Sequence, residues 1–279
     1  MNTKMVRYIL CRMLGVEAAL LLVPVLVAVI YQEKCGIVFL IPIGILCLLF
    51  WVAGRKRPEH GQIYGKEGMV IVALAWILWS LFGAMPFTLS GYIPSYVDAF
   101  FETVSGFTTT GSSIIPDVEV LPHCLLFWRS FTHWIGGMGV LVFVLVVTSL
   151  DRKNSMYLMR AEVPGPEKDK LVPKAMSTAR ILYGMYLILT VIEMVFLVIG
   201  GMNLFDSMIF SFGSAGTGGF SNYADSVAHF NSAYIDGVIT VFCALFGVNF
   251  ALFYFMILGD FKSILKNEEL RTYILLIAG

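Results

Sequence analysis

The chain has 279 residues, of which 58% are hydrophobic and 14% charged, and its 19 basic and 19 acidic residues cancel to a net charge of +0. Soluble domains carry about 25% charged residues, so the composition argues against a soluble domain, and we expect no nucleic-acid partner. Apolar runs long enough to cross a bilayer, about 20 residues each, recur along the chain. The composition therefore predicts an all-α polytopic membrane protein embedded in a lipid bilayer.

Residues with side chains suited to catalysis or metal binding are scattered. The five cysteines form no CxxC pair and no cluster with histidine, which argues against a zinc site and a disulfide framework. The four histidines are far apart in the sequence, and no Ser/His/Asp set or carboxylate pair is evident. We expect the protein not to be an enzyme.

Hydrophobic runs predict six membrane-spanning helices in chain order. Two shorter apolar segments, 98–107 and 205–214, are about half a membrane thick and are predicted to re-enter the membrane without crossing it. A last apolar stretch begins at Arg271 and is too short to span, so we interpret it as the start of a further repeat. The predicted spans are 12–31, 36–53, 69–90, 123–150, 179–201 and 233–259.

Charge placement supports this topology. Every Lys and Arg except Lys34 and Arg129 falls near the N-terminus or within 55–66, 152–180 or 262–271. These groups lie on one side of the membrane if the half-length segments do not cross, and the positive-inside rule makes that side, with the N-terminus, cytoplasmic. The opposite side is predicted to be a negatively charged vestibule that attracts cations. Its acidic residues are Glu33, Asp98, Glu102, Asp117, Glu119, Asp206, Asp225 and Asp236.

The chain contains one unit twice, in 69–150 and 179–259. Each unit has a span, a half-length segment, a polar loop with glycine, and a second span. The sequences DAFFETVSGFTTTGSS and DSMIFSFGSAGTGGFS align so that Asp98 precedes Gly111 by the same separation as Asp206 precedes Gly219. Both units begin and end on one side, so they are parallel repeats around an axis along the membrane normal, where a pore can form.

Non-helical backbone at membrane depth is tolerated where protein covers it or where it lines a water-filled cavity. An extended Thr/Gly loop can turn carbonyl oxygens inward and replace the hydration shell of a cation. Two alternatives are weaker. TTTGSS would suit an ordinary helix cap, and SAGTGG would suit an anion-binding nest, although no lysine follows it as in a phosphate-binding loop.

Four segments together resemble the TrkH-type potassium transporters of the Trk/Ktr/HKT superfamily: SGFTTTGSS, RSFTHWIGGMGVLVF (129–143), SAGTGGFSN and WILWSLFGAMPFTLSGY (76–92). The resemblance implies two N-terminal helices, then span–pore-loop–span repeats of potassium-channel type, four of them around one pore. It also implies a homodimer in a prokaryotic cytoplasmic (inner) membrane and a cytoplasmic nucleotide-binding regulatory subunit. On this pattern 1–60 is the N-terminal helix pair, 61–150 the first repeat, 151–262 a cytoplasmic loop with the second repeat, and 263–279 the start of a third.

The resemblance also assigns the residues of a K⁺ filter. They are Thr109, Thr110 and Gly111 in the first loop, with Thr108 at the inner end, and Thr217, Gly218 and Gly219 in the second. Ser112 and Phe220 follow these walls as candidate supports. An alignment of Gly218 with Gly111 would shift the second wall by one residue. Glycine at the first-loop position implies potassium as the transported ion, with a sodium-permeable transporter of the same superfamily as the alternative.

Arg129 lies within a predicted span, where an ionisable group is expected to have a partner. We expect Glu102 or Asp117 to pair with it and brace the filter loop; the alternative is that Arg129 extends to the membrane interface. Gly136, Gly137 and Gly139 indicate close helix packing, and the alternative is a hinge or pore-lining role. No role is assigned to His133. The predicted function is potassium uptake by a channel or a symporter, and the alternative is a structural or assembly subunit with non-conducting loops.

Overall fold

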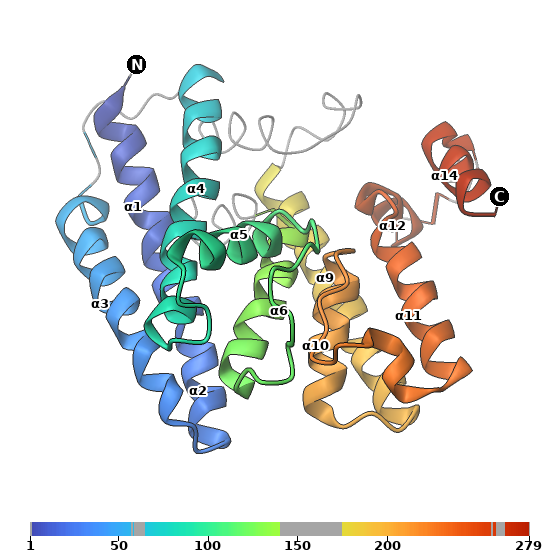
Figure 1. The fold of residues 1–279 in the computed structure, drawn as a ribbon. Helices are drawn as coiled ribbons and strands as arrows, with labels where there is room; N and C mark the ends of the chain where they lie inside the picture. Colours follow the sequence, from blue (N-terminus) through green and yellow to red (C-terminus); the bar gives the residue numbers. More distant parts are fainter. Residues whose placement is uncertain are drawn as a thin grey trace.

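The computed structural model describes residues 2–56, 58, 65–139, 175–257, 259–260 and 266–278, and these residues contain helices and loops without strands. The helix bounds follow from the hydrophobic runs and the turns between them (Figure 1). The elements are α1 (Thr3–Leu20), α2 (Leu22–Ile30), η1 (Lys34–Phe39), α3 (Leu40–Leu49), η2 (Phe50–Gly54), α4 (Gly65–Leu89), α5 (Tyr96–Phe107), α6 (His123–Gly137), α9 (Ala175–Ile199), α10 (Leu204–Ala215), η4 (Ser226–Phe230), α11 (Ala233–Phe246), α12 (Phe250–Ile257) and α14 (Glu268–Ala278).

The described residues contain four helical stretches that are long and apolar enough to cross a membrane: Thr3–Ile30, Lys34–Gly54, Lys66–Leu89 and Ile181–Ile199. The half-length segments form α5 and α10, of 12 residues each. At about 1.5 Å per residue, such a helix extends about 18 Å, roughly half of the bilayer. The protein is therefore an all-α polytopic membrane protein, as the sequence predicts.

Three predicted spans differ from the structure. The first begins at Thr3 and is interrupted at Leu21, because Pro24 has no N–H to donate to the carbonyl of the preceding turn. The prediction of one helix over 233–259 is wrong: α11 ends at Phe246 and α12 starts at Phe250. Glycine and asparagine at 247 and 249 disfavour a continuous helix. The prediction of one helix over 123–150 is also wrong at its centre, because α6 ends at Gly137 and Gly139 has a positive φ of 73°. Residues 140–174, which include the rest of that predicted span and most of the basic loop, lie outside the described residues.

Helix α14, within the expected start of a third repeat, packs where α11 ends. The Tyr273 hydroxyl donates to the Ala244 carbonyl at 2.9 Å, and Asn249 Nδ2 donates to Glu269 Oε2 at 3.1 Å. A side chain at Gly247 would collide with Tyr273. The interruption between α11 and α12 is therefore filled by contacts from α14.

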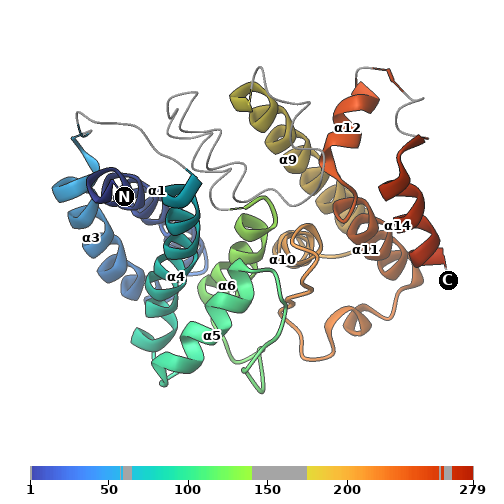
Figure 2. The same ribbon diagram turned by 90° about the horizontal axis from the view of Figure 1, so that it is seen from above.

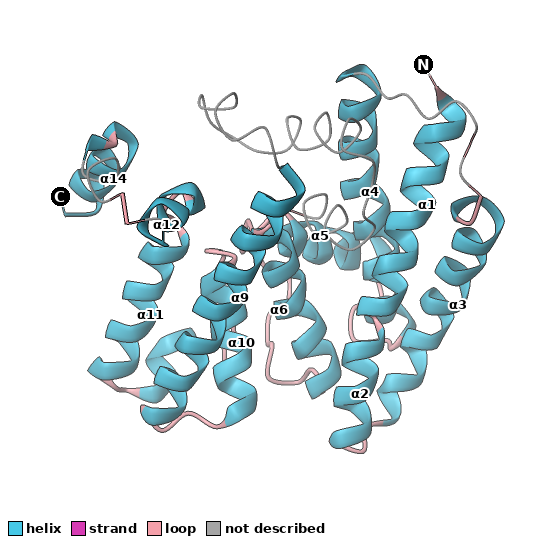
Figure 3. Cartoon of the chain, turned by 180° about the vertical axis from the view of Figure 1, so that it is seen from behind, coloured by secondary structure: helices cyan, strands magenta, loops and turns pink. Residues whose placement is uncertain are grey.

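Helix α6 is the centre of the described structure and lies between α5 and α10 (Figures 1 and 2). The core beside it is aromatic: Phe107 packs edge-on against Trp79 and Trp128, with ring centroids 5.6 and 6.1 Å apart. The connections after α2, before α6 and between α9 and α10 lie at the end of the bundle opposite the N-terminus (Figure 3). The half-length helices of the two repeats, α5 and α10, thus lie on the two sides of α6.

Candidate functional site

Both half-length helices begin with the same capping arrangement. Ser95 Oγ accepts from the Asp98 backbone N–H at 3.3 Å, and Asn203 Oδ1 accepts from the Asp206 N–H at 2.8 Å. These side chains satisfy N–H groups that the first turn of a helix leaves unpaired. The two caps lie at matching positions of the repeats, so the sequence duplication is also a structural one.

The loops that follow the two helices have the same backbone conformation. Thr109 and Gly111 have φ values of 55° and 78°, and Thr217 and Gly219 have values of 54° and 80°. Non-glycine residues with positive φ are uncommon, so a threonine in this region at both matching positions is a specific feature. The pattern favours Gly219, rather than Gly218, as the counterpart of Gly111.

The hydrogen bonds that close each loop also match. The Thr109 N–H donates to the Gly106 carbonyl at 3.0 Å, and the Thr217 N–H donates to the Ser214 carbonyl at 2.8 Å. One residue later, Thr110 donates to the carbonyl of Ser105 at 2.9 Å; its counterpart is the bond from Gly218 to Gly213, at 3.1 Å. Each loop is thus anchored on the last turn of its own half-length helix.

The two loops meet at glycine. A Cβ added to Gly111 would collide with the carbonyl oxygen of Gly218, so the α-carbon of the first loop lies against the backbone of the second. A Cβ added to Gly219 would meet nothing within 4 Å. Gly111 is therefore required both by its positive φ and by this close approach, whereas Gly219 is required by φ alone.

Two consecutive glycines of α6 receive the ends of both half-length helices. A Cβ on Gly136 would collide with the carbonyl oxygen of Phe107, the last residue of α5, and one on Gly137 would lie 2.9 Å from the carbonyl oxygen of Ala215, the last residue of α10. Phe107 and Ala215 occupy matching positions of the repeats. The C-terminal ends of the two half-length helices therefore converge on one turn of α6.

An ion pair inside the protein connects α5 to α6. Arg129 Nε donates to Glu102 Oε1 at 2.6 Å, and the two residues are 4% and 1% exposed. The Glu102 carboxylate also accepts from Ser113 Oγ at 3.0 Å and from the Ile114 N–H at 2.9 Å. These contacts hold the segment just after Gly111, and they satisfy a charge whose burial is otherwise costly.

Arg129 also reaches the second loop. Its Nη1 donates to the Ser221 carbonyl at 2.9 Å, and its Cζ lies 3.6 Å from the centroid of the Phe220 ring. Of the two carboxylates considered from the sequence, Glu102 is the partner; Asp117 is exposed and accepts from the Glu119 N–H. The alternative that Arg129 extends to the interface is wrong, because its side chain is buried and paired.

His133 contacts the second loop from α6, a role that was not predicted from the sequence. Its ring is fully buried and stacks on Phe220, with centroids 3.9 Å apart and an interplanar angle of 10°. The spacing of Arg129 and His133 could have indicated this, because residues four apart share a helix face. Phe220 was expected to support the second wall, but its contact with two residues about ninety positions earlier could not be predicted from the sequence.

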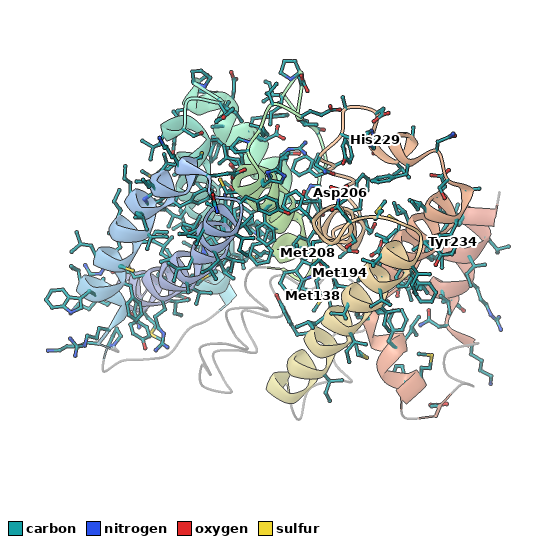
Figure 4. The ribbon with its side chains drawn as sticks, turned by 90° about the horizontal axis from the view of Figure 1, so that it is seen from below. Met138, Met194, Asp206, Met208, His229 and Tyr234 are labelled. Carbon is teal, nitrogen blue, oxygen red and sulfur yellow. The ribbon has the colours of Figure 1, made fainter. Side chains whose placement is uncertain are left out.

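The carboxylate of Asp206 is buried at the start of α10. It accepts from the side-chain amides of Asn203 and Asn222, each at 2.7 Å, and from the Tyr223 hydroxyl at 2.9 Å. Figure 4 shows Asp206 on the side of α10 that faces the loop carrying His229. Partial burial, with the hydrogen bond to Asp206, raises the pKa of Tyr223 to about 12.

Glu33 caps α6 from a loop far away in sequence. Its Oε1 accepts from the backbone N–H of His123 at 2.7 Å and lies 2.9 Å from His123 Nδ1, while Oε2 accepts from the Cys124 N–H at 3.0 Å. Burial alone would raise the pKa of this carboxyl, but the hydrogen bonds from Cys124 and His123 outweigh it and lower the pKa. The negative charge also complements the N-terminal end of the helix dipole.

These contacts reduce the charge available to a negative vestibule. Of the eight acidic residues expected there, Glu33, Glu102 and Asp206 are occupied by hydrogen bonds inside the structure. Asp98 is half-buried, and the remaining four are exposed: Asp117, Glu119, Asp225 and Asp236.

A cavity of about 220 Å³ lies between the two loops, bounded by Gly111, Ser113, Gly219, Ser221 and Arg129 among others. Within the described ranges, no group of three or more His, Cys, Asp or Glu side chains could hold a metal ion. Thr108, Thr110, Ser112 and Thr217 are exposed at the loops, while Thr109 and Gly218 are half-buried. The oxygens that the loops offer to a ligand are thus backbone carbonyls and hydroxyls, which suit a hard cation such as K⁺ better than an anion.

Comparison with known proteins gives a consistent result. A family model for TrkH, described as a cation transport protein, matches residues 38–278. The Trk system potassium uptake protein TrkH of Escherichia coli K12 is 35% identical over 261 residues, which cover 91% of this chain and 53% of the relative. The Trk system potassium uptake protein TrkG of the same strain is 34% identical over 100% of this chain and 59% of its own length.

A solved structure is also similar. The crystal structure of the potassium transporter TrkH from Vibrio parahaemolyticus superposes with a TM-score of 0.84 at 30% sequence identity, covering 99% of this chain and 57% of that one. The chain therefore spans little more than half the length of the relatives that it matches.

Proposed function

The chain belongs to the TrkH family of cation transport proteins, and we propose that it is a potassium-translocating subunit. In this proposal Thr109, Thr110 and Gly111 form one wall of a selectivity filter, and Thr217, Gly218 and Gly219 form a second. The observation that carries it is the repeated positive φ at Thr109/Gly111 and Thr217/Gly219. The names of the relatives, which are potassium uptake proteins, support K⁺ as the ion.

The mechanism that we infer is dehydration at the loops. K⁺ exchanges hydration water for the carbonyl oxygens of the two walls, as in filters built from rings of backbone carbonyls. The C-terminal ends of α5 and α10, which carry partial negative charge, converge on α6 below the walls and favour a cation. The exposed carboxylates on the surrounding loops raise the local cation concentration.

The proposal places the protein in a prokaryotic inner membrane, and the placement of basic residues supports a cytoplasmic N-terminus. With this orientation the loops face outward, and the interior-negative potential drives K⁺ inward by about 2.3 kcal/mol per charge per 100 mV. The proposal includes a homodimer and a cytoplasmic nucleotide-binding regulatory subunit, for which the naming of the relatives as parts of a Trk system gives support. No enzymatic step is part of it.

Uptake of Rb⁺ or K⁺ by the full-length protein, in bacteria that lack other potassium uptake systems, tests the proposal. Gly111→Ala combines a positive φ with a collision against Gly218, so we expect loss of uptake or of discrimination against Na⁺. Gly184→Ala is the matched control, because it makes the same change on α9 where the added methyl group meets nothing within 4 Å. Equal uptake by the two variants would refute the filter assignment and favour loops with a structural role.

A further inference from the structure

His133 is a fully buried imidazole that the proposed transport mechanism does not use. It lies on α6 four residues after Arg129, on the face that contacts the second loop. Within the described structure neither ring nitrogen makes a hydrogen bond of good geometry, although the backbone of Ser105 lies close to the ring. The stacking and packing contacts of the ring are therefore the main interactions of His133.

The two α6 side chains hold Phe220 between them. The guanidinium carbon of Arg129 lies 3.6 Å from the Phe220 centroid, and the His133 ring lies parallel to Phe220 at 3.9 Å. Two groups this close to one ring cannot share a face, so they pack against opposite faces. Phe220, which is 2% exposed and directly follows Gly219, is thereby fixed relative to α6.

The edge of the same imidazole faces the wall itself. A Cβ added to Gly218 would collide with Cε1 of His133 and lie 2.8 and 2.9 Å from its Nε2 and Nδ1. A Cβ added to Gly216 would lie 2.8 Å from the His133 backbone carbonyl. The side chain and the backbone of one α6 residue thus lie behind two residues of the second loop.

We propose that His133 is a positioning residue that sets the distance of the second filter wall from α6, and thereby the cation discrimination of the pore. This inference rests on the proposed transport function. The first wall has a different support, because Glu102 holds the segment that follows Gly111. Since Arg129 contacts both Glu102 and Phe220, the supports of the two walls meet at one guanidinium.

The contact with His133 also explains why residue 218 is glycine. Gly218 is absent from the residues with positive φ, so its backbone would accept alanine, and the obstacle is the imidazole. Gly219 is the opposite case, with a φ of 80° and open space around the position of a Cβ. The two adjacent glycines therefore respond differently to a change at His133.

A second-site rescue experiment uses this difference. Rb⁺ and Na⁺ uptake are measured for the full-length protein carrying Gly218→Ala or Gly219→Ala, each with and without His133→Ala, at matched abundance in the membrane. We expect Gly218→Ala to reduce Rb⁺ uptake about tenfold or more, and His133→Ala to restore it to within about threefold of the His133→Ala single variant. Gly219→Ala stays inactive in both backgrounds, because its strain is in the backbone.

The His133→Ala single variant has a second readout. We expect it to take up Rb⁺ while its Rb⁺-to-Na⁺ ratio falls about threefold or more, because the second wall loses its support. His133→Asn, which is also smaller than histidine, replaces it if the alanine variant fails to reach the membrane. Absence of rescue at Gly218, or an unchanged ion ratio in the single variant, would overturn the proposal.

Failure of the proposed function gives a different result. If the wild-type protein takes up neither Rb⁺ nor K⁺, the transport proposal fails for all variants alike. Thermal unfolding of the same variants then still tests the contact between His133 and residue 218. We expect His133→Ala to relieve the destabilisation caused by Gly218→Ala and to leave the destabilisation caused by Gly219→Ala unchanged.

Discussion

Replacing Glu102 with glutamine leaves the Arg129 guanidinium without its counter-charge in the protein interior. Removing one member of a buried ion pair costs about 3–5 kcal/mol. Arg129 keeps its bond to the Ser221 carbonyl and its contact with the Phe220 ring, which offset about 1–2 kcal/mol of this. We therefore expect the free energy of unfolding to fall by about 1–4 kcal/mol and Tm by about 3–12 °C.

Thermal unfolding of the detergent-solubilised protein, followed by tryptophan fluorescence, measures the loss of stability. Asp117→Asn is the control, because this exposed carboxylate accepts from the Glu119 N–H and its neutralisation should change stability by less than about 0.5 kcal/mol. An equal Tm for Glu102→Gln and Asp117→Asn would refute the assignment of Glu102 as the buried partner of Arg129.

A double replacement separates stability from function. Methionine at both Glu102 and Arg129 removes the charges together, so the cost of burying an unpaired charge disappears and much of the stability should return. The hydrogen bonds to Ser113 and Ser221 do not return, so the connection that Glu102 and Arg129 make between the two loops is lost. We expect a stable protein with impaired Rb⁺ uptake. Normal uptake would show that this connection between the loops is dispensable for transport.

Three further changes test the surroundings of the loops. Glu33→Gln should lower Tm at pH 7 by the equivalent of about 1 kcal/mol. Because folding lowers the pKa of Glu33, the advantage of the wild type is fully present above the ordinary glutamate pKa of 4.5 and is lost as pH falls through the lowered pKa. Unfolding curves of both proteins between pH 3 and 7 would measure this difference. Tyr223→Phe removes a donor from the buried Asp206 and should cost about 1–2 kcal/mol in the same assay, and an unchanged Tm would contradict the hydrogen bond. Gly136→Ala forces a methyl group against the last carbonyl of α5 and should reduce both Tm, by the equivalent of about 1–3 kcal/mol, and Rb⁺ uptake; a stable, active variant would contradict the close approach.

The parts of this fold that depend on length and repetition could be predicted from the sequence. The apolar segments 98–107 and 205–214 are too short to span, and they form the short helices α5 and α10. The matching positions of Gly111 and Gly219 were visible as equal separations from an aspartate, and the backbone has the same positive φ at both. These features are local, so the residues that determine them lie close together in the chain.

Contacts between distant segments could not be predicted in this way. The capping of His123 and Cys124 by Glu33 joins residues about ninety positions apart, and a single acidic residue in a loop gives no indication of its partner. The interruption after Phe246 depends on Tyr273 and on the sequence around Gly247, which in a hydrophobicity profile is one weak point in a long apolar run.

The adjacent glycines of α6 have a consequence for how the sequence can change over evolutionary time. Gly136 and Gly137 point about 100° apart around the helix, and each faces a different repeat. One residue inserted or deleted between Arg129 and Gly136 would rotate both glycines by about 100° relative to the Arg129 guanidinium. Neither glycine would then face the end of its half-length helix. We therefore expect this stretch of α6 to keep its length among functional homologues, even where the amino acids on its outer face diverge, because this one helix positions the ends of both half-length helices.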